Sequence, residues 1–200
     1  MHLIGKNLGY YYQENQWLFK DVNLSVSPGE VLGLSGYSGC GKTTLAKILA
    51  GYIQPRKGMV ILDQKPIEQR VFRPVQLIYQ HPEKAINPKW RMREVLAESY
   101  KPSQDILDAF GIKDEWMDRW PIELSGGELQ RFCIVRALNP ATKYIIADEM
   151  TTMLDAITQA KIWHSLLSIC ESRKIGLIVV SHEKSLINRI CNRVYKVGQN

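Results

Sequence analysis

Residues 36–44 carry glycines, a lysine and two threonines at the spacing of a phosphate-binding loop. Glycine lets the backbone turn tightly, so successive amide N–H groups can point at phosphate oxygens. Lys42 adds a mobile positive charge, and Thr43 offers a hydroxyl to a magnesium ion that bridges the β- and γ-phosphates. This stretch therefore predicts the binding of a nucleoside triphosphate. Its members are Gly36, Tyr37, Ser38, Gly39, Cys40, Gly41, Lys42, Thr43 and Thr44.

Two adjacent carboxylates, Asp148 and Glu149, follow the apolar run at residues 144–147. Neighbouring acids at the end of a buried strand are costly unless a cation compensates their charge. A magnesium ion held by Thr43 and Asp148 would supply that cation. Glu149 would then be left to polarise the attacking water as a general base.

Two further polar residues stand at the ends of apolar runs. Gln80 ends the run at residues 75–80, and its amide can ligate magnesium or orient a water, although a glutamine here could also belong to an ordinary loop. His182 follows the run at residues 175–180, where a lone histidine is commonly structural. Because the same edge is expected to hold a nucleotide, we expect His182 to form a hydrogen bond with the γ-phosphate.

Ser125 and Glu128 have the spacing of a capping box, which on its own would only stabilise the start of a helix. Capping does not require Gly126 and Gly127 between them, because each glycine inside a helix costs roughly 1 kcal/mol relative to alanine. Bare amides and a serine hydroxyl at a helix start instead predict a second anion-binding surface.

The pattern of apolar residues predicts the elements that position these side chains. Helical spacing follows the phosphate loop as far as Gly51, so the loop stands between a strand and a helix, as phosphate binding requires. Two alternating runs within residues 3–26 predict two strands joined by a turn at residues 13–16. Further strands are expected at residues 30–34, 59–62, 75–80, 144–147 and 175–180, and helices at 92–110 and 126–138.

Tyr10, Tyr11 and Tyr12 stand just before the expected turn. One of them could stack on an adenine ring, because an aromatic face accepts any planar base without a specific hydrogen-bond pattern. Ordinary strand aromatics explain the three residues equally well, so the residues alone leave both interpretations open.

The composition indicates one globular domain, with or without a subdomain, because 45% of the 200 residues are hydrophobic. No apolar stretch reaches the roughly 18 residues needed to cross a bilayer, and the N-terminus lacks the layout of a signal peptide, so we expect a cytoplasmic protein. The four cysteines are widely scattered, which predicts reduced thiols. The net charge of +6 is spread along the chain and does not favour nucleic acid as a partner.

In this order the motifs resemble those of the ATP-binding cassette (ABC) ATPases, from the first strand to Val197. The resemblance implies an α/β P-loop NTPase fold with a mixed central sheet and an antiparallel β region at the N-terminus. It also implies a single domain over residues 1–200, with a catalytic core at 1–83 and 141–200 and a helical subdomain at 84–140. The matching motifs are Tyr12 (the adenine-stacking aromatic), residues 36–43 (Walker A), Gln80 (Q-loop), 124–128 (signature), 145–149 (Walker B), Leu154-Asp155 (D-loop) and His182 (switch histidine).

The family resemblance implies that the site binds ATP and Mg²⁺, with Glu149 and His182 as catalytic residues and Asp155 and Glu128 close to the nucleotide. Two such domains, identical or related, would pair head to tail. Ser125 and Gly127 of one chain would then cover the γ-phosphate held by the phosphate loop of the other.

The resemblance also implies partners. The pair would energise transmembrane permease subunits at the cytoplasmic face of the cell membrane, with an extracytoplasmic solute-binding protein as an indirect partner. Residues 80–88 are similar to the same region of the oligopeptide, dipeptide and nickel importer branch. A peptide, nickel or a related metal chelate is therefore the expected solute.

Three features depart from the family pattern. Glu128 replaces a glutamine, which keeps the capping geometry but adds negative charge near a phosphate, so we expect slower turnover. Residues 150–153 read Met-Thr-Thr-Met where the family shows Pro-Thr-Ser and a small residue, so we expect an altered link to the D-loop. The chain ends at Asn200, soon after its last expected strand, so the tail-mediated contacts of the importer branch are not expected.

Two other functions compete with import. A soluble cassette ATPase that acts on DNA or the ribosome is disfavoured, because the chain has one cassette and no long heptad insertion. A nucleotide-gated binding module without turnover would be favoured only if Glu149 or His182 were missing. Both residues are present, so the sequence favours ATP hydrolysis that powers an importer.

Overall fold

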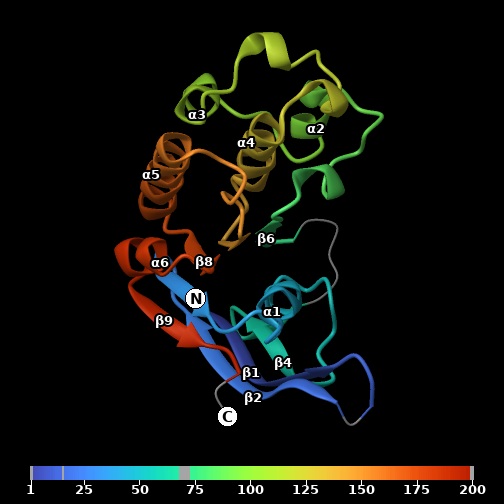
Figure 1. Cartoon of the computed structure of the whole chain (residues 1–200), viewed down its shortest axis with the longest axis vertical. Helices are drawn as coiled ribbons and strands as arrows, with labels where there is room; N and C mark the ends of the chain where they lie inside the picture. Colours follow the sequence, from blue (N-terminus) through green and yellow to red (C-terminus); the bar gives the residue numbers. More distant parts are fainter. Residues whose placement is uncertain (1, 15, 68–72, 199–200) are drawn as a thin grey trace.

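The computed structural model describes residues 2–14, 16–67 and 73–198, and its strands form two sheets (Figure 1). Antiparallel pairing joins the first sheet in the order β2-β1-β4-β5. Parallel pairing joins the second sheet in the order β6-β7-β8-β3-β9. The strands are β1 (Leu3–Tyr11), β2 (Trp17–Val26), β3 (Val31–Ser35), β4 (Lys57–Leu62), β5 (Lys65–Pro66), β6 (Val75–Ile78), β7 (Tyr144–Asp148), β8 (Gly176–Val180) and β9 (Arg193–Lys196).

Helices cover both faces of the parallel sheet. The α-helices are α1 (Lys42–Leu49), α2 (Met92–Ala97), α3 (Gln104–Ala109), α4 (Gly126–Ala137), α5 (Ala156–Ser172) and α6 (Lys184–Ile190). One-turn 3-10 helices lie at Pro82–Lys84, Asp114–Trp116 and Pro121–Glu123. None of the helices in the described part of the chain combines the length and the hydropathy needed to cross a membrane.

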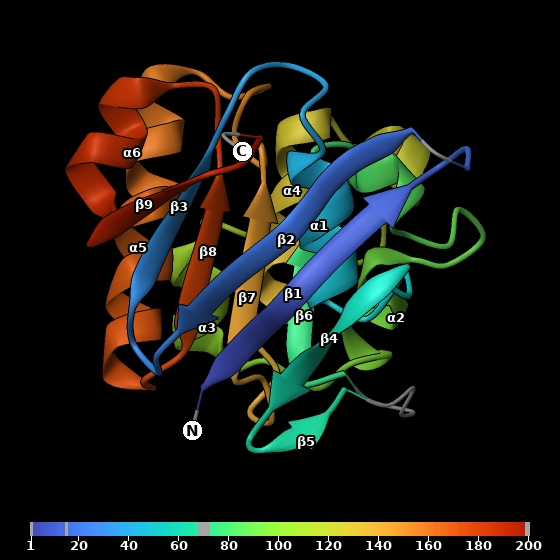
Figure 2. The same cartoon turned by 90° about the horizontal axis from the view of Figure 1, so that it is seen from below.

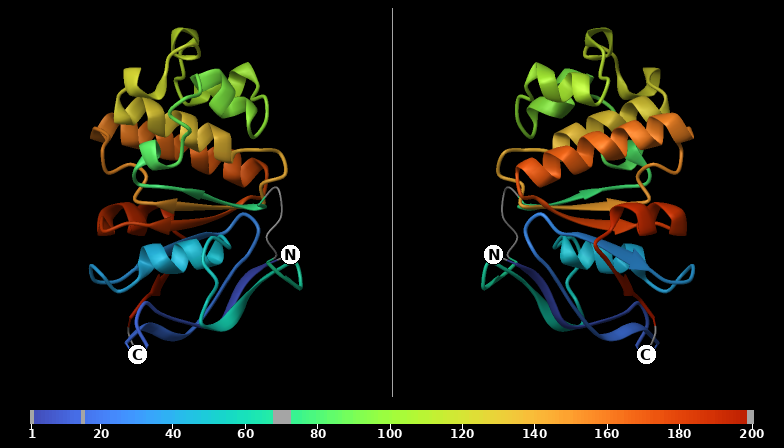
Figure 3. Two further views of the ribbon diagram at one scale, coloured as in Figure 1. Left: turned by 90° about the vertical axis from the view of Figure 1, so that its right-hand side faces the viewer. Right: turned by 90° about the vertical axis from the view of Figure 1, so that its left-hand side faces the viewer.

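The elements are stacked in layers, which the side views of Figure 3 show. Helix α1 lies between the antiparallel sheet and one face of the parallel sheet, whereas α4 and α5 cover the opposite face. Helices α2 and α3 lie beyond α4, at the end of the molecule away from the antiparallel sheet (Figure 1). From below, β1 and β2 run obliquely across the parallel strands (Figure 2). The helix that follows the phosphate loop is therefore enclosed between two sheets.

The parallel strands separate two hydrophobic cores. Every residue of β7 and β8 is buried, and successive side chains point to opposite faces of the sheet. In β7, Tyr144 and Ile146 pack around α1, whereas Ile145 and Ala147 pack under α4 and α5. A strand covered on both faces reads as a continuous apolar run. This burial explains why these strands were visible in the sequence.

The expected combination of parallel and antiparallel pairing is present, divided between two sheets. The single helix expected over residues 92–110 is corrected to two short helices, α2 and α3. Pro102 disfavours helical backbone in the residue before it, and Ser103 is extended (ψ 158°) before α3 begins. Helices α5 and α6 and strand β9 were not among the expected elements.

The expected turn at residues 13–16 and the expected reduced cysteines can also be compared with the structure. In the turn expected at residues 13–16, the Gln16 N–H donates to the Gln13 carbonyl (3.1 Å). The rest of that turn includes Asn15, which lies outside the described residues, as does Asn200.

The four cysteines are free thiols, as expected. Burial raises the pKa of Cys133 to about 11 and that of Cys170 to about 12, which keeps both protonated.

Candidate functional site

The candidate residues follow four neighbouring strands at one edge of the parallel sheet. Strands β6, β7, β8 and β3 lie side by side in this order and run in the same direction, so their carboxyl ends share an edge. Gln80 follows β6, Asp148 and Glu149 end β7, His182 follows β8 and residues 36–44 follow β3. Ligands of open α/β sheets bind at this edge.

The phosphate loop has the backbone that its glycines predict. Gly39 and Gly41 have φ values of 83° and 97°, which favour glycine, and α1 begins directly after them. A Cβ on Gly39 would meet nothing within 4 Å, so the loop is open at this point. The buried Lys42 donates from Nζ to the carbonyls of Gly36 and Tyr37, each at 3.0 Å. Its ammonium is thus folded back onto the loop that an anion would occupy.

Tyr12 forms a hydrogen bond with the last residue of the phosphate loop. Its hydroxyl lies 2.8 Å from Thr44 Oγ1, and its side chain is 66% exposed. Tyr10 is buried, and Tyr11 packs edge-on against Trp17 at a ring distance of 5.0 Å. Of the three candidate aromatics, Tyr12 therefore has the most exposed ring beside the loop. Within the loop, Ser38 is exposed and Cys40 is buried.

Thr43 and Asp148 form the first close pair of the site. The Thr43 hydroxyl donates to Asp148 Oδ1 at 3.3 Å. Burial raises the pKa of Asp148, and the hydrogen bond from Thr43 counteracts part of that rise. Among the described residues, no group of three or more His, Cys, Asp and Glu could hold a metal ion. A hydroxyl and one carboxylate fit Mg²⁺, which takes one or two protein carboxylates together with phosphates and waters.

Glu149 and His182 form the second close pair. Glu149 Oε1 lies 2.8 Å from His182 Nε2, and the Glu149 side chain is 17% exposed. Glu149 has a φ of 49°, a left-handed conformation that strains a residue with a Cβ. A hydrogen bond from its N–H to the Val180 carbonyl (3.0 Å) helps to hold this conformation. Backbone strain of this kind clusters at functional sites.

Gln80 reaches the segment that follows Glu149. Its Nε2 lies 3.5 Å from Thr152 Oγ1, and the Thr152 hydroxyl donates to the Glu149 carbonyl at 3.1 Å. The amide is therefore near the carboxylate pair, although the structure gives it no direct contact with Asp148 among the described residues. The geometry places Gln80 beside the site and leaves its metal role a prediction.

The predicted signature residues form a capping box at the start of α4. The Ser125 N–H donates to Glu128 Oε2 (2.7 Å), and the Glu128 N–H donates to Ser125 Oγ (3.3 Å). Ser125 and Gly126 are exposed. A Cβ on Gly127 would lie 2.7 Å from Leu154 Cδ2, so this glycine allows α4 to approach the D-loop. Within the described residues, no hydrogen bond joins residues 125–128 to residues 36–44.

Asp155 caps helix α5. Its carboxylate accepts from the N–H groups of Ile157 (3.1 Å) and Thr158 (3.0 Å). The hydrogen bonds from Thr158 hold the pKa of Asp155 below its usual range. The structure therefore assigns Asp155 a clear helix-capping role, and its contact with a nucleotide stays a prediction.

The structure adds a group of polar side chains that the sequence patterns did not single out. Thr151 is buried and accepts hydrogen bonds from Gln159 and Trp163 of α5, and Gln159 also contacts Glu183. Gln159 and Trp163 are four residues apart and so share a helix face. The four-residue spacing could have indicated a shared helix face from the sequence, but it does not reveal which residues that face contacts.

The sequence matches a family model described as "ABC transporter" over residues 19–152. The Nickel import system ATP-binding protein NikE of Staphylococcus aureus (strain bovine RF122 / ET3-1) is 31% identical over 94% of this chain and 83% of the relative. The Nickel import ATP-binding protein NikE of Escherichia coli (strain K12) is 32% identical over 90% of this chain and 75% of the relative.

Solved structures share the fold. A dimeric ATP-binding cassette, MJ0796, in a post-hydrolysis state bound to ADP and Pi, has a TM-score of 0.83 at 25% identity and covers 98% of this chain and 94% of its own. The cbiO1 protein from Clostridium perfringens, part of the ABC transporter complex cbiONQ, has a TM-score of 0.78 at 25% identity over 97% and 83%. The family suggested by the order of motifs is thus confirmed, and the chain belongs to the ABC transporter family as an ATP-binding domain.

Proposed function

We propose that this chain hydrolyses ATP to power an ABC importer. The observation that carries the proposal is the meeting of two residue pairs at one edge of the parallel sheet, Thr43 with Asp148 and Glu149 with His182. The first pair suits a phosphate-bound cation, and the second suits the activation of a water. Beside a phosphate loop, these two pairs supply what the transfer of a phosphoryl group to water requires, a site for a metal ion and a base that positions the water.

The phosphate loop would hold the triphosphate of ATP through its amide N–H groups. Lys42 would turn its ammonium from two main-chain carbonyls to the terminal phosphates, because a charge-assisted hydrogen bond is stronger than a neutral one. Tyr12 would stack on the adenine. Thr43 and Asp148, with Gln80 nearby, would hold Mg²⁺, which neutralises charge on phosphate oxygens when it is bound.

Glu149 would take a proton from the water that attacks the γ-phosphorus. In the same reaction the bond from the γ-phosphorus to the bridging oxygen breaks, and ADP keeps the electron pair. His182 holds Glu149 through the 2.8 Å contact and would extend its second hydrogen bond toward the γ-phosphate. The strained backbone of Glu149 supports this role, because strain of this kind clusters at functional sites.

The signature residues would complete the site of a second chain. The exposed Ser125 and Gly126 present a hydroxyl and an amide to solvent. Helix α1, which follows the phosphate loop of the same chain, lies on the opposite face of the parallel sheet from α4. The dimeric state of a similar cassette bound to ADP and Pi supports a head-to-tail pair of identical or related chains. Asp155, at the D-loop, would lie at the same junction.

The import function rests on the relatives. Two proteins with more than 30% identity are named for nickel import, which supports nickel, a related chelate or a peptide as solute. Permease subunits at the cytoplasmic face of the membrane would contact Gln80 and the helical residues 84–140, and a solute-binding protein would act indirectly. Recovery of multi-spanning subunits with this chain from solubilised membranes tests the proposal, and recovery of ribosomes or DNA instead would contradict it.

The hydrolytic role is tested by Glu149→Gln. The amide cannot accept a proton from water, so hydrolysis should fall by a factor on the order of 10² to 10⁴ while ATP binding is retained. The matched control is Glu171→Gln on the exposed end of α5, which should leave both unchanged. Steady-state ATPase rates and nucleotide titration measure the two quantities. Hydrolysis within a few-fold of the unmodified protein would exclude Glu149 as the base.

A further inference from the structure

A hydrogen-bonded group lies directly behind the Glu149–His182 pair. Thr151 Oγ1 accepts from Gln159 Nε2 at 2.9 Å and from Trp163 Nε1 at 3.1 Å. Thr151 and Trp163 are each 4% exposed, so the bond between them is shielded from water, whereas the bond from the half-buried Gln159 is only partly buried. A buried indole N–H that loses its acceptor is costly, which makes the position of Thr151 well defined. The segment that carries Glu149 is therefore anchored to α5 two residues beyond the proposed base.

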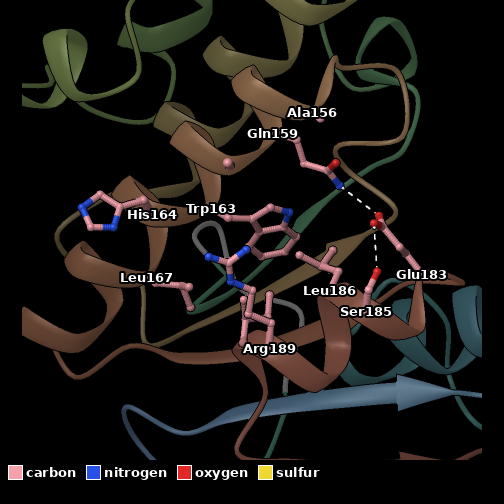
Figure 4. A pocket seen from close by; sticks show the side chains of 11 residues that line it. Ala156, Gln159, Trp163, His164, Leu167, Glu183, Ser185, Leu186 and Arg189 are labelled. Carbon is pink, nitrogen blue, oxygen red and sulfur yellow. Dashed lines mark hydrogen bonds between the residues drawn. The ribbon is translucent and has the colours of Figure 1, made fainter.

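Gln159 extends this anchor to the segment that carries His182. Its Nε2 also donates to Glu183 Oε2 at 3.3 Å, and Glu183 accepts at Oε1 from Ser185 Oγ at 3.2 Å (Figure 4). The N–H of Glu183 donates to Ser181 Oγ at 3.0 Å. A carboxylate only accepts hydrogen bonds, so the Gln159 amide must present its NH₂ to Glu183. One side chain of α5 thus contacts both segments that carry the proposed catalytic pair.

Two cavities together border the Glu149–His182 pair and the hydrogen bonds of Gln159. A cavity of about 130 Å³ is lined by Glu149, Thr151, Gln159 and His182, among others. A larger cavity of about 350 Å³ adjoins it between α5 and α6 and shares Gln159, Trp163 and Glu183 as walls (Figure 4). Side chains that border empty space are not held by packing alone. The main chains of the two segments are joined where they leave the sheet, by the β7–β8 ladder and the Glu149 N–H to Val180 carbonyl bond. Farther from the sheet, the hydrogen bonds of Gln159 add a side-chain tie between them.

We propose that Gln159 is a positioning residue for ATP hydrolysis. It acts through Thr151 and Glu183 to keep Glu149 and His182 at their contact distance. The inference rests on the proposed roles of Glu149 and His182 and adds a residue that touches neither the nucleotide nor the water. Because a misplacement of about 1 Å can cost about 10² in rate, a tie between the two segments has a direct effect on kcat.

The first test is Gln159→Met, which keeps the length of the side chain and removes both hydrogen bonds. We expect kcat to fall about tenfold while the KM for ATP changes less than about twofold, because the change affects the reacting groups and not the phosphate loop. The matched control is Lys161→Met, an exposed residue on the same helix, which should leave kcat unchanged. Melting temperatures of both variants show that the fold is kept.

The second test separates positioning from packing at Thr151. Thr151→Val keeps the shape and removes the acceptor, whereas Thr151→Ser keeps the hydroxyl. We expect Thr151→Val to lower kcat about as much as Gln159→Met, and Thr151→Ser to restore kcat to within about threefold of the unmodified protein. The indole N–H resonance of Trp163 should move in Thr151→Val and return in Thr151→Ser.

The third test uses Glu183, whose exposed side chain can be truncated without unfolding the protein. Glu183→Ala should lower kcat, and combining it with Gln159→Met should add less than the product of the two single effects, because both remove the same tie. Independent, fully multiplicative effects would overturn the proposal. So would a kcat within twofold of the unmodified protein in Gln159→Met while Glu149→Gln is inactive. If Glu149→Gln itself hydrolyses ATP normally, the proposed function fails instead.

Discussion

At the scale of single residues, the site keeps two features that the fold alone would not select. Asp148 is a carboxylate with 4% exposure, and Glu149 is held at a positive φ. The first costs desolvation and the second costs backbone strain. Both costs fall on adjacent residues at the end of β7, where the proposed chemistry takes place. Two such costs on neighbouring residues at a site are typical of selection for function.

The cost at Asp148 gives a prediction with a defined sign. Burial raises its folded-state pKa above the unfolded value, so the stabilising contribution of the protonated form is present at low pH and is lost as the pH rises through the folded pKa. At neutral pH the carboxylate therefore destabilises the metal-free protein. Asp148→Asn should raise the melting temperature near pH 7.5, and the gain should shrink as the pH is lowered.

The matched control for this prediction is Asp155→Asn, at the start of α5. Hydrogen bonds from Thr158 lower the pKa of Asp155, so its charged form stabilises the fold above the unfolded pKa. This variant should lower the melting temperature near pH 7.5, opposite in sign to Asp148→Asn. Thermal unfolding across pH without nucleotide or metal measures both. A lower melting temperature for Asp148→Asn at neutral pH would show that the carboxylate is compensated in the metal-free protein.

At the scale of elements, the sequence predicted strands better than helices. Strands β7 and β8 are covered on both faces and so appear as unbroken apolar runs bounded by polar residues. Helix α5 was missed although Ile162, Trp163, Leu166 and Cys170 are buried at helical spacing, because its first turn follows an irregular segment without an apolar pattern. The expected helix over residues 92–110 ignored the constraint that Pro102 places on the preceding residue.

In the candidate site, the residues at strand ends could be predicted from the sequence, whereas contacts made by helix packing could not. Residues at strand ends were predictable, because parallel strands bring their carboxyl ends to one edge and motif order supplies their types. The contacts of Gln159 were not predictable, because they depend on how α5 packs against segments at residues 149–155 and 181–183. Sequence spacing defines a helix face, and only tertiary packing decides what that face meets.

The start of α4 provides an element-scale prediction about Glu128. Its carboxylate accepts from the Ser125 N–H, and the oxygen of a glutamine amide can accept the same bond. Glu128→Gln should therefore change stability by less than about 1 kcal/mol, the usual size of a helix-dipole interaction. It also removes a negative charge beside the proposed phosphate-covering surface, so ATP turnover should rise about two- to tenfold.

A matched control for Glu128→Gln exists in the same region. Glu123 Oε2 accepts from the Trp120 N–H (2.6 Å) at the start of the 3-10 helix just before α4, as Glu128 Oε2 accepts from the Ser125 N–H. Glu123→Gln makes the same chemical change outside the signature residues and should leave turnover unchanged. Equal turnover in both variants and the unmodified protein would show that the charge of Glu128 does not act on the nucleotide.

At the scale of the whole molecule, the phosphate loop and the signature residues precede helices on opposite faces of the parallel sheet. Helix α1, which follows the phosphate loop, packs on one face of the parallel sheet, and α4, which follows Ser125, covers the opposite face (Figure 3). A Cβ added to Gly126 or Gly127 would meet Met153 or Leu154, respectively, of the same chain. We therefore expect the signature residues of a second chain to complete the site.

The pairing of two chains can be tested by mixing two inactive variants. Lys42→Ala should lose ATP binding, and Ser125→Arg should keep binding but block closure, because a bulky cation replaces a hydroxyl at the helix start. In a mixed pair of otherwise identical chains, one site combines the intact Lys42 of one chain with the intact Ser125 of the other. At most about half of the activity of an unmodified pair should therefore return.

The control is Lys42→Ala mixed with Glu149→Gln. The Thr43–Asp148 bond places both of these changes in the same chain's half of a site, so neither site of the mixed pair is intact. Activity that stays flat across mixing ratios for Lys42→Ala with Ser125→Arg, despite proven mixed pairs, would show that the signature residues serve their own chain.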